Sequence, residues 1–224
     1  ILLTHPFGWS GEVEKIKILC DQFGIKLIED AAACIGNQSN GKYLGTIGDA
    51  GIFSFNGNKT ITAGAGGALL VRDKTTFKRA KHLSATAKVE HPFRYVHDEI
   101  GFNYRMPNLN AALCLSQFRK LQDILKNKRR IHDYYLENIC PENMAFLYSP
   151  LGPNEGTPWL NTIKLGSSAR AVDLLNYLIS DQIFARMCWE PLHKLKPYSK
   201  YKDRPLPVAE ELQPRIINLP SYVG

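Results

Sequence analysis

The stretch ILLTHPFGWSGEVEKIKILCDQFGIKLIEDAA, residues 1–32, contains the pattern that decides the fold class. Residues 1–4 are typical of a short buried strand, and residues 11–23 of a helix that Ser10 can cap. Residues 26–29 (KLIE) are typical of a second strand. A strand, a helix and a strand in succession predict two parallel strands in an α/β layer. The sequence therefore predicts an α/β fold.

The elements after this unit predict the domain organisation. We expect strands at 51–55 and 68–72, a helix at 74–83, a long ordered loop at 84–107 and a long helix at 108–138, capped by Asn108. Residues 141–158 contain four prolines and two glycines, a composition that favours a boundary. A strand at 160–165, a helix at 169–179 and a strand at 184–188 then predict a small α+β domain. We assign residues 1–140, with the helix 108–138, to a large domain and residues 141–224 to a small C-terminal domain.

Composition bounds the possible functions. The chain has 224 residues, of which 44% are apolar, enough for one large and one small domain. Its five cysteines are widely spaced and form no CxxC pair, which favours a reducing, cytoplasmic compartment and no metal site. The first residues lack the basic segment of a signal peptide, so we expect none, and no apolar run reaches about 20 residues, so we expect no membrane partner. The net charge of +7 is compatible with nucleic acid or with an anionic small substrate.

Two residues could carry chemistry. Asp30 follows the strand 26–29 directly, and ligands of open α/β sheets bind at the carboxyl ends of strands. Taken alone, a helix cap explains Asp30 better. Lys59 lies in a loop after the strand 51–55, and a neutral lysine amine forms imines with aldehydes. For a lysine taken at random, a solvated loop position is the better explanation.

Ser54 and a group of glycines add to the pattern around Lys59. The Ser54 hydroxyl could bond a phosphate, although a strand serine can equally bond the backbone. Gly64, Gly66 and Gly67 allow tight turns and close approach to a ligand. Each feature is weak evidence alone.

Taken together, these motifs resemble the sugar aminotransferases of the DegT/DnrJ/EryC1/StrS family, which have the type I fold of pyridoxal phosphate (PLP) enzymes. The segments that carry the resemblance are EDAA at 29–32, GDA at 48–50, FSF at 53–55, NK at 58–59, GAGG at 64–67, GFNYRM at 101–106, AA at 111–112 and EPLH at 190–193. The chain looks closest to the LegC-like branch. The resemblance implies a three-layer sandwich with a mainly parallel sheet, plus the small α+β domain.

The resemblance also assigns roles. Lys59 would be the catalytic lysine, which holds PLP as a Schiff base and moves the proton. Asp30 would pair with the pyridinium nitrogen, and Ser54 would contact the cofactor phosphate. Asn103 would reach the cofactor of the neighbouring subunit, because family sites lie at a homodimer interface.

The reaction implied by the resemblance is an amino transfer. Glutamate would donate the amino group to the 4-keto carbon of a UDP-linked keto-deoxysugar, on the way to amino sugars of the legionaminic acid type and to surface polysaccharide. The family's sugar 3-dehydratase branch has His at the lysine position, and Lys59 argues against that branch. His193 lies in a segment that resembles a family stretch near the sugar; a satisfied loop histidine is an equally good interpretation.

The sequence departs from the family at two important points. Ala33 stands among the cofactor-binding positions where the family usually has Gln, or Glu in the LegC-like branch, and an alanine side chain cannot hydrogen-bond. The family's N-terminal part, with its phosphate-binding loop, is absent, so we expect the chain to be a fragment of a longer protein. Ala65 also differs from the family residue, and we attach little weight to it.

Two other classes of function remain open at this point. A non-catalytic relative with a binding or regulatory role is compatible with Ala33 and with the absent N-terminal part. Nucleic-acid binding would use the dense basic cluster at 126–130, but a solvated helix face explains that cluster better, and we expect no nucleic-acid partner. We expect Trp159 and Trp189 to belong to the core.

Overall fold

The computed structural model describes residues 1–139, 144–146, 156–201 and 205–223. The chain divides into two compact units. The first unit comprises Ile1–Leu125 and Pro150–Thr157, and the second comprises Lys126–Ser149 and Pro158–Gly224. No helix in the described part of the chain is long and apolar enough to cross a membrane. The expected division between residues 140 and 141 falls on residues outside the described set and stays a prediction.

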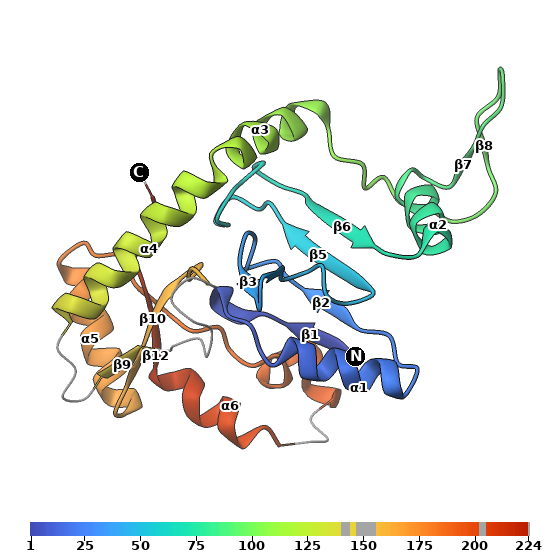
Figure 1. Cartoon of the computed structure of the whole chain (residues 1–224). Coiled ribbons are helices and arrows are strands. Elements are labelled where there is room, and N and C mark those ends of the chain that lie inside the picture. Colours follow the sequence, from blue (N-terminus) through green and yellow to red (C-terminus); the bar gives the residue numbers. More distant parts are fainter. Residues whose placement is uncertain (140–143, 147–155, 202–204, 224) are drawn as a thin grey trace. The chain divides into compact units, whose positions relative to one another are not determined.

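A four-stranded sheet with the order β1-β2-β5-β6 forms the centre of the first unit (Figure 1). Its strands are β1 (Leu2–Thr4), β2 (Ile28–Asp30), β5 (Ala50–Ser54) and β6 (Gly67–Val71). β1, β2 and β5 are parallel, and β6 is antiparallel to β5. Thr4 pairs with Asp30, and Asp30 pairs with Ile52, so the carboxyl ends of the parallel strands share one edge. The predicted parallel α/β arrangement is confirmed.

Helix α1 (Val13–Gln22) connects β1 to β2, as the sequence predicts. Its Val13 and Cys20 are fully buried and pack in one apolar cluster with Leu27. The expected cap at Ser10 is wrong. The helix begins three residues later at Val13, and the Ser10 hydroxyl donates to the carbonyl of its neighbour Gly11.

Glu29 fastens a loop to the sheet, although it belongs to the same motif as Asp30. Its carboxylate is fully buried and accepts backbone N–H bonds from the loop after the hairpin β3 (Gln38–Ser39) and β4 (Lys42–Tyr43). The donors are Gly45, Ile47 and Gly48, at 2.8, 2.7 and 2.6 Å, and His5 Nε2 lies 3.0 Å away. Burial opposes ionisation, but these hydrogen bonds together hold the pKa of Glu29 below its usual value.

Gly51 lets this loop approach the sheet. A Cβ at Gly51 would lie 1.8 Å from the carbonyl oxygen of Gly45, a distance that no side chain tolerates. Gly45 itself has φ +83° and has no room for a Cβ beside Phe53 and Ala31. These glycines therefore fix the geometry of the sheet around Glu29.

The segment after β6 contains more structure than the sequence predicts. α2 (Lys74–Ser84) is capped by the Asp73 carboxylate, which accepts from the Thr76 N–H. The expected loop at 84–107 contains the hairpin β7 (Lys88–Val89) and β8 (Val96–His97), which extends away from the sheet in Figure 1. Strands of two residues are too short to show an alternating pattern in a sequence.

The expected long helix at 108–138 is two helices, α3 (Asn108–Arg119) and α4 (Leu121–Asn138), separated at Lys120. The expected cap is also wrong, because Asn108 is the first helical residue and Pro107 occupies the N-cap. None of the α3 residues is buried, whereas Leu121 of α4 is buried with Phe55, Ile61 and Ala63. Helical spacing cannot reveal a break at one polar residue, because both helices continue the same period.

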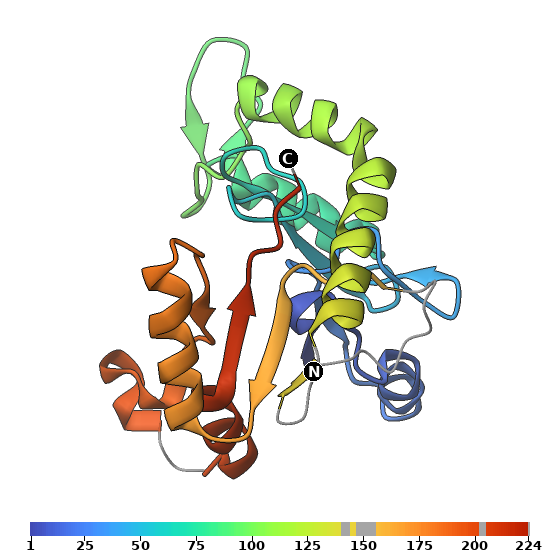
Figure 2. The ribbon, with the colours of Figure 1, turned by 90° about the vertical axis from the view of Figure 1, so that its left-hand side faces the viewer.

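The second unit contains an antiparallel sheet with the order β11-β12-β10-β9. Its strands are β9 (Met144–Phe146), β10 (Asn161–Leu165), β11 (Arg186–Met187) and β12 (Ile216–Leu219); Figure 2 shows β12 (red) beside β10 (orange). Its helices are α5 (Ser168–Ser180), α6 (Pro207–Leu212) and the C-terminal part of α4. Short 3-10 helices lie at Pro6–Gly8 in the first unit and at Leu192–Lys194, Lys196–Tyr201 and Gln213–Arg215 in the second. The expected α+β composition is confirmed, but the sequence reasoning missed β9 and β12.

One residue of the basic cluster at 126–130 is buried, so its interpretation as a solvated helix face is wrong for Lys128. Lys128 Nζ donates to the carbonyl oxygens of Trp159 (2.9 Å) and Ser221 (2.6 Å). Burial lowers the pKa of Lys128 to about 8. Trp159 is buried as expected, whereas Trp189 is 57% exposed and stacks on it at 5.8 Å, so the expectation for Trp189 is wrong.

Candidate active site

Asp30 is the last residue of β2 and lies at the carboxyl edge of the parallel strands. Its backbone carbonyl accepts from the N–H of His5, and the following residue, Ala31, donates to Ile52. Asp30 Oδ1 accepts from the Ala32 N–H at 3.1 Å, which orients the carboxylate. No helix begins at Ala31 in the structure, so the simpler interpretation of Asp30 as a helix cap is wrong. A half-buried carboxylate is therefore held at the edge where α/β sheets bind ligands.

Ser54 and Lys59 belong to the neighbouring strand β5 and to the loop after it. Ser54 is the last residue of β5, two positions beyond the partner of Asp30, and its Oγ accepts from the Asn56 N–H at 3.4 Å. Lys59 lies in the loop after β5, and its N–H donates to the Asn56 carbonyl at 3.0 Å. Both residues are half-buried. The structure thus places Asp30, Ser54 and Lys59 on or just after adjacent parallel strands.

The electrostatic surroundings of Lys59 distinguish it from a solvated loop lysine. Burial lowers the pKa of Lys59, while the nearby Asp30 carboxylate acts in the opposite direction. A charge on Cys34 would act in the same direction as Asp30, but burial raises the pKa of that thiol far above its usual value and keeps it neutral. Lys59 therefore combines partial desolvation with one neighbouring carboxylate, which is a setting for amine chemistry.

Ala33 and Cys34 lie in the turn after Asp30. Ala33 is half-buried, and Cys34 is buried with its Sγ donating to the Ala31 carbonyl at 3.6 Å. The sequence reasoning did not single out Cys34, although its position four residues after Asp30 was visible. The thiol belongs to the buried apolar cluster of this unit, and burial raises its pKa, as is usual for a structural cysteine.

Asn103 lies in the same unit, in the segment that returns from the β7–β8 hairpin. It forms an isolated bridge with Ala85, and its side chain is exposed. The segment is fastened to α2 by Arg79 with Glu99 and by His82 Nε2 with Asp98 Oδ1 at 2.7 Å. An exposed Asn103 is compatible with the predicted role toward a neighbouring subunit, which stays a prediction.

The side chains of His82, Asp98 and Glu99 converge, with ligand atoms within 4.8 Å of one another. Arg79 already pairs with Glu99 through both of its terminal nitrogens, and His82 bonds Asp98. These contacts give both carboxylates protein donors. They explain the cluster as a structural contact that attaches the segment after the β7–β8 hairpin to α2. The pKa of Glu99 is accordingly lowered, chiefly by the hydrogen bond from Arg79.

His193 lies in the second unit, and its predicted contact with the sugar stays a prediction. Its Nε2 lies 2.9 Å from Glu210 Oε1 of α6, and Lys194 Nζ lies 3.6 Å from the other oxygen of Glu210. The hydrogen bond from His193 is the largest cause that lowers the pKa of Glu210. The structure thus provides the partner that a satisfied loop histidine requires, without deciding its role.

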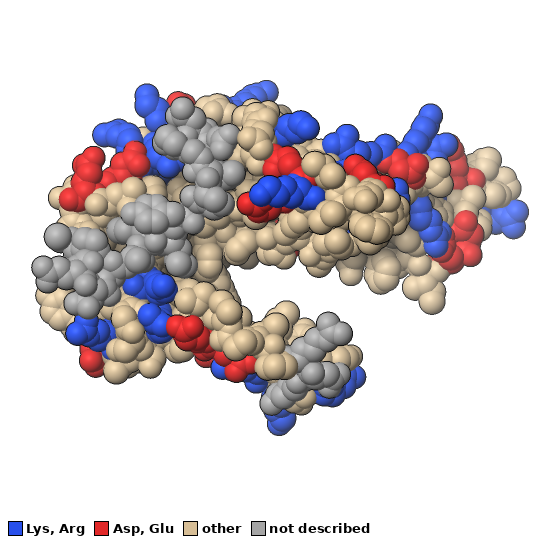
Figure 3. All heavy atoms as spheres, turned by 60° about the horizontal axis from the view of Figure 1, so that its bottom comes forward, with Lys and Arg blue, Asp and Glu red and all other residues tan. Residues whose placement is uncertain are grey.

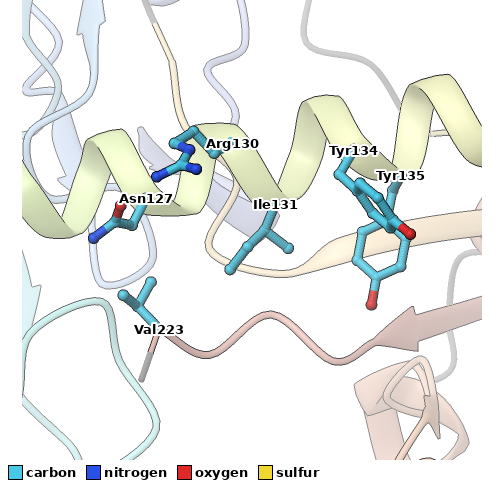
Figure 4. A pocket seen from close by; sticks show the side chains of 6 residues that line it. All are labelled: Asn127, Arg130, Ile131, Tyr134, Tyr135 and Val223. Carbon is cyan, nitrogen blue, oxygen red and sulfur yellow. The ribbon is translucent and has the colours of Figure 1, made fainter.

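The second unit also contains an open cavity of about 570 Å³ (Figure 4). It is lined by one side of α4 and by the chain after β12: Asn127, Arg130, Ile131, Tyr134, Tyr135 and Val223. Its lining offers one cation and two phenols but no lysine and no carboxylate. The cavity therefore lacks the groups for amine chemistry, and the site around Lys59 is the stronger candidate.

Charge at the surface does not favour a nucleic-acid site. On the face shown in Figure 3, Lys and Arg are interspersed with Asp and Glu rather than gathered into a continuous basic area. Lys128 is buried and Arg129 is half-buried, so the basic cluster at 126–130 offers fewer charges to solvent than its sequence suggests. Nucleic-acid contacts need exposed cations that reach phosphates.

The fold and the site together define a class: an α/β protein with a partly desolvated lysine beside a carboxylate at the carboxyl edge of parallel strands. The chain belongs to the DegT/DnrJ/EryC1/StrS aminotransferase family, whose model matches residues 1–224. Aminotransferases of this family are PLP-dependent, with the type I fold. The predicted family and fold class are confirmed, whereas the LegC-like branch stays a prediction.

Individual relatives support the same grouping. GDP-perosamine synthase of Escherichia coli O157:H7 is 37% identical over 223 residues, which cover 99% of this chain and 60% of the relative. A UDP-N-acetyl-3-dehydro-α-D-glucosamine 3-aminotransferase of Acidithiobacillus ferrooxidans is 27% identical over 99% of this chain and 59% of its own length. Helicobacter pylori PseC, an aminotransferase of pseudoaminic acid biosynthesis, superimposes with a TM-score of 0.88 at 25% identity, over 99% of this chain and 61% of PseC. The chain thus spans about 60% of the length of these relatives.

Proposed function

We propose that the protein is a PLP-dependent aminotransferase that transfers an amino group to the keto carbon of a nucleotide-linked keto-deoxysugar. The observation that carries the proposal is Lys59, an amine partly desolvated beside the Asp30 carboxylate at the carboxyl edge of the sheet. Family membership supports amino transfer, and the named relatives support a nucleotide-linked substrate. Because the chain spans about 60% of those relatives, the proposal concerns the complete protein.

The residues present fit the chemical groups of PLP. The cofactor has an aldehyde, a ring nitrogen and a phosphate, and the site offers an amine, a carboxylate and a hydroxyl in Lys59, Asp30 and Ser54. Gly64 and Gly66, with φ +78° and +96°, shape the turn that follows Lys59. Ala33 is the one position in the set that offers no polar atom from its side chain.

When bound, PLP supplies an aldehyde that exchanges amines and a ring that withdraws electrons from the reacting carbon. Lys59 Nζ would hold the cofactor and then take and return a proton, first for the amino donor and then for the sugar. Partial burial favours this role, because it lowers the pKa of Lys59 and increases the fraction of neutral amine.

Asp30 and Ser54 would bind and orient. The Ala32 N–H holds Asp30 Oδ1, and we assign Oδ2 to the ring nitrogen, whose proton the negative charge retains. The Ser54 Oγ accepts from Asn56, so its O–H can donate to a phosphate oxygen. Ser54 lies two positions beyond the strand partner of Asp30, so the two side chains could reach different groups of one ligand.

A second copy of the chain is part of the proposal. We assign Asn103 to the cofactor of a neighbouring subunit in a homodimer, since it is exposed and held in place by the segment fastened to α2. The large exposed side chains near it, Tyr104 at 75% and Ile100 at 86%, offer apolar area for such a contact.

The finer substrate assignment follows the resemblance to the LegC-like branch. We propose UDP as the nucleotide, the 4-keto carbon as the acceptor and glutamate as the donor, with a product that enters amino-sugar and surface polysaccharide synthesis. The E. coli relative carries GDP in its name, so GDP is the alternative that an experiment must separate. The cysteines described by the structure are free thiols, which supports a cytoplasmic location.

The first experiment tests cofactor binding in the product of the complete gene. The purified protein incubated with PLP is expected to show the visible absorbance of lysine-bound cofactor, and Lys59→Ala is expected to lose it. Lys126→Ala, an exposed lysine of α4, is the matched control. No such band in a folded wild-type protein would favour the alternative, a non-catalytic relative with a binding or regulatory role.

The second experiment identifies the substrate. The protein is incubated with glutamate, glutamine or aspartate and with 4-keto sugars linked to UDP, GDP or dTDP. The product masses are measured by mass spectrometry. Conversion of the UDP-linked sugar with glutamate would support the full assignment. Conversion of the GDP-linked sugar alone would keep the aminotransferase and replace the nucleotide.

A further inference from the structure

The loop that carries Lys59 is closed by its own backbone. The N–H of Ala63 donates to the carbonyl of Phe55 at 2.9 Å, and the Thr62 hydroxyl donates to the same carbonyl at 3.2 Å. Gly64 N–H in turn donates to Thr62 Oγ1 at 2.8 Å. We call residues 55–63 the lysine loop; Lys59 lies at its middle, four residues from each end.

A side chain of another element holds the far end of this loop. Asn110 Nδ2, in the first turn of α3, donates to the carbonyl oxygen of Ala63 at 2.6 Å. Ala63 and Ile61 are fully buried, and Asn110 is half-buried. A carbonyl at a buried residue needs a donor, so this bond fixes where the loop rejoins the core.

The turn after the lysine loop packs against the same part of α3 and the residues before it. A Cβ at Gly66 would lie 2.9 Å from Met106 Cε, and a Cβ at Gly64 would lie 3.8 Å from Asn110 Nδ2. Both glycines have positive φ, so a side chain would also strain the backbone there. The GAGG and GFNYRM motifs therefore meet in one contact, which Asn110 completes.

We infer that Asn110 is a positioning residue for Lys59: its bond to Ala63 sets how deeply the lysine loop lies and hence how far Lys59 is desolvated. The inference rests on the proposed function, because it assigns a purpose to the reactivity of Lys59. Few residues separate the Asn110–Ala63 hydrogen bond from the amine of Lys59. Ala63 is one end of a loop closed at Phe55, so a shift at Ala63 moves the loop that carries Lys59.

The test uses Asn110→Asp, Asn110→Ala and Asn110→Ser in the complete protein. Aspartate has the shape of asparagine but places a carboxylate against the Ala63 carbonyl, so it repels where asparagine bonds. Alanine removes the hydrogen bond without adding charge. The alanine variant replaces the aspartate variant in the test if the aspartate variant does not fold. Serine keeps a donor on a shorter side chain.

The first readout is independent of the cofactor. The rate at which an amine reagent labels Lys59 in cofactor-free protein is measured against pH by peptide mass spectrometry. Because burial lowers the pKa of Lys59, a loosened loop is expected to move the midpoint of this profile to higher pH in the aspartate and alanine variants. The second readout is PLP affinity, which is expected to fall about three- to tenfold.

Asn108→Asp is the matched control, because it makes the same change at an exposed position of the same helix. It is expected to leave both readouts at the wild-type values. If the Asn110 variants lower the thermal midpoint yet keep the wild-type labelling profile, Asn110 is merely structural and the inference is overturned. A wild-type protein that never binds PLP would refute the proposed function, while the labelling profile would still decide the link from Asn110 to Lys59.

Discussion

Lys59 in the first unit and Lys128 in the second are both desolvated, yet their surroundings differ. Burial lowers the pKa of each amine. Lys128 donates to two backbone carbonyls, from Trp159 and Ser221, which joins α4 to the chain before β10 and after β12. Lys59 lies in a loop at a sheet edge, near a carboxylate. The partners therefore distinguish the two lysines: the two carbonyls give Lys128 a structural role, whereas the carboxylate near Lys59 is the setting in which we propose chemistry.

The neighbours of Lys128 strengthen this interpretation. One turn later, His132 Nδ1 lies 2.8 Å from Asn161 Oδ1, and Asn161 donates to Ser221 Oγ. Desolvation is the largest cause that lowers the pKa of His132. Lys128 and His132 of α4 are thus joined to Asn161 and Ser221 by buried hydrogen bonds. Such a network stabilises the unit only while every member is satisfied.

The largest expected effect is on activity. Lys59→Ala is expected to lower amino transfer by about 10³-fold or more, because the amine that moves the proton is gone. Thermal unfolding is expected to change little, since Lys59 is only half-buried. Steady-state kinetics with the nucleotide-sugar and a thermal melt measure the two quantities. A variant that keeps more than a tenth of wild-type activity would remove the distinction between the two lysines.

Lys128→Met is expected to show the opposite pattern, with a loss of about 2–4 kcal/mol in unfolding free energy and no direct effect on chemistry. Methionine fills similar volume but leaves the carbonyls of Trp159 and Ser221 without their donor. Denaturation and hydrogen exchange at residues 159–161 and 219–221 measure the loss. Lys126→Met, exposed on the same helix, is the control and is expected to stay within about 0.5 kcal/mol.

Lys128 also predicts how stability depends on pH. Its pKa of about 8 in the folded protein lies below the ordinary value of 10.5, so between these values the unfolded chain binds more protons. Unfolding free energy therefore rises with pH across this window, by about 3 kcal/mol in total. This contribution is fully present above pH 10.5, falls as pH decreases, and is lost by about pH 8. Neutral Lys128 still has two N–H bonds for its two carbonyls.

The measurement is the difference between wild type and Lys128→Met at each pH, because other lysines, tyrosines and cysteines titrate in the same range. The difference is expected to grow in favour of wild type from pH 8 to 10. An equal pH dependence in both proteins would show that Lys128 titrates as it does in water.

His193→Ala separates two interpretations of a single residue. If His193 contacts the sugar, KM for the nucleotide-sugar is expected to rise about tenfold with kcat nearly unchanged. If His193 only satisfies Glu210, the thermal midpoint is expected to fall and KM to stay constant. Glu210→Gln is the control, since it alters the same pair from the other side.

The sequence predicted the positions of the sheet edge better than the roles of individual charges. Asp30 and Ser54 end two strands that follow from apolar runs, Lys59 lies in the loop after the second strand, and the parallel pairing brings both strand ends to one edge. The burial of Lys128 could not be predicted, because its two acceptors lie 31 and 93 residues away. The anchor at Asn110 was hidden for the same reason, since Ala63 lies 47 residues before it.

The smallest expected effect concerns Ala33, where the chain lacks the polar residue typical of its family. Ala33→Gln is expected to raise PLP affinity about threefold to tenfold, because one added hydrogen bond is worth about 0.5–1.5 kcal/mol. Ala33→Met adds similar volume without a polar atom and is the control. A gain with Gln but not with Met, measured by absorbance titration, would show that the site binds its cofactor with one fewer polar contact. Equal PLP affinities in all three proteins would mean that the half-buried turn holds the side chain at position 33 away from the ligand. Of the proposed contacts within this chain, Lys59, Asp30 and Ser54 would then account for cofactor binding.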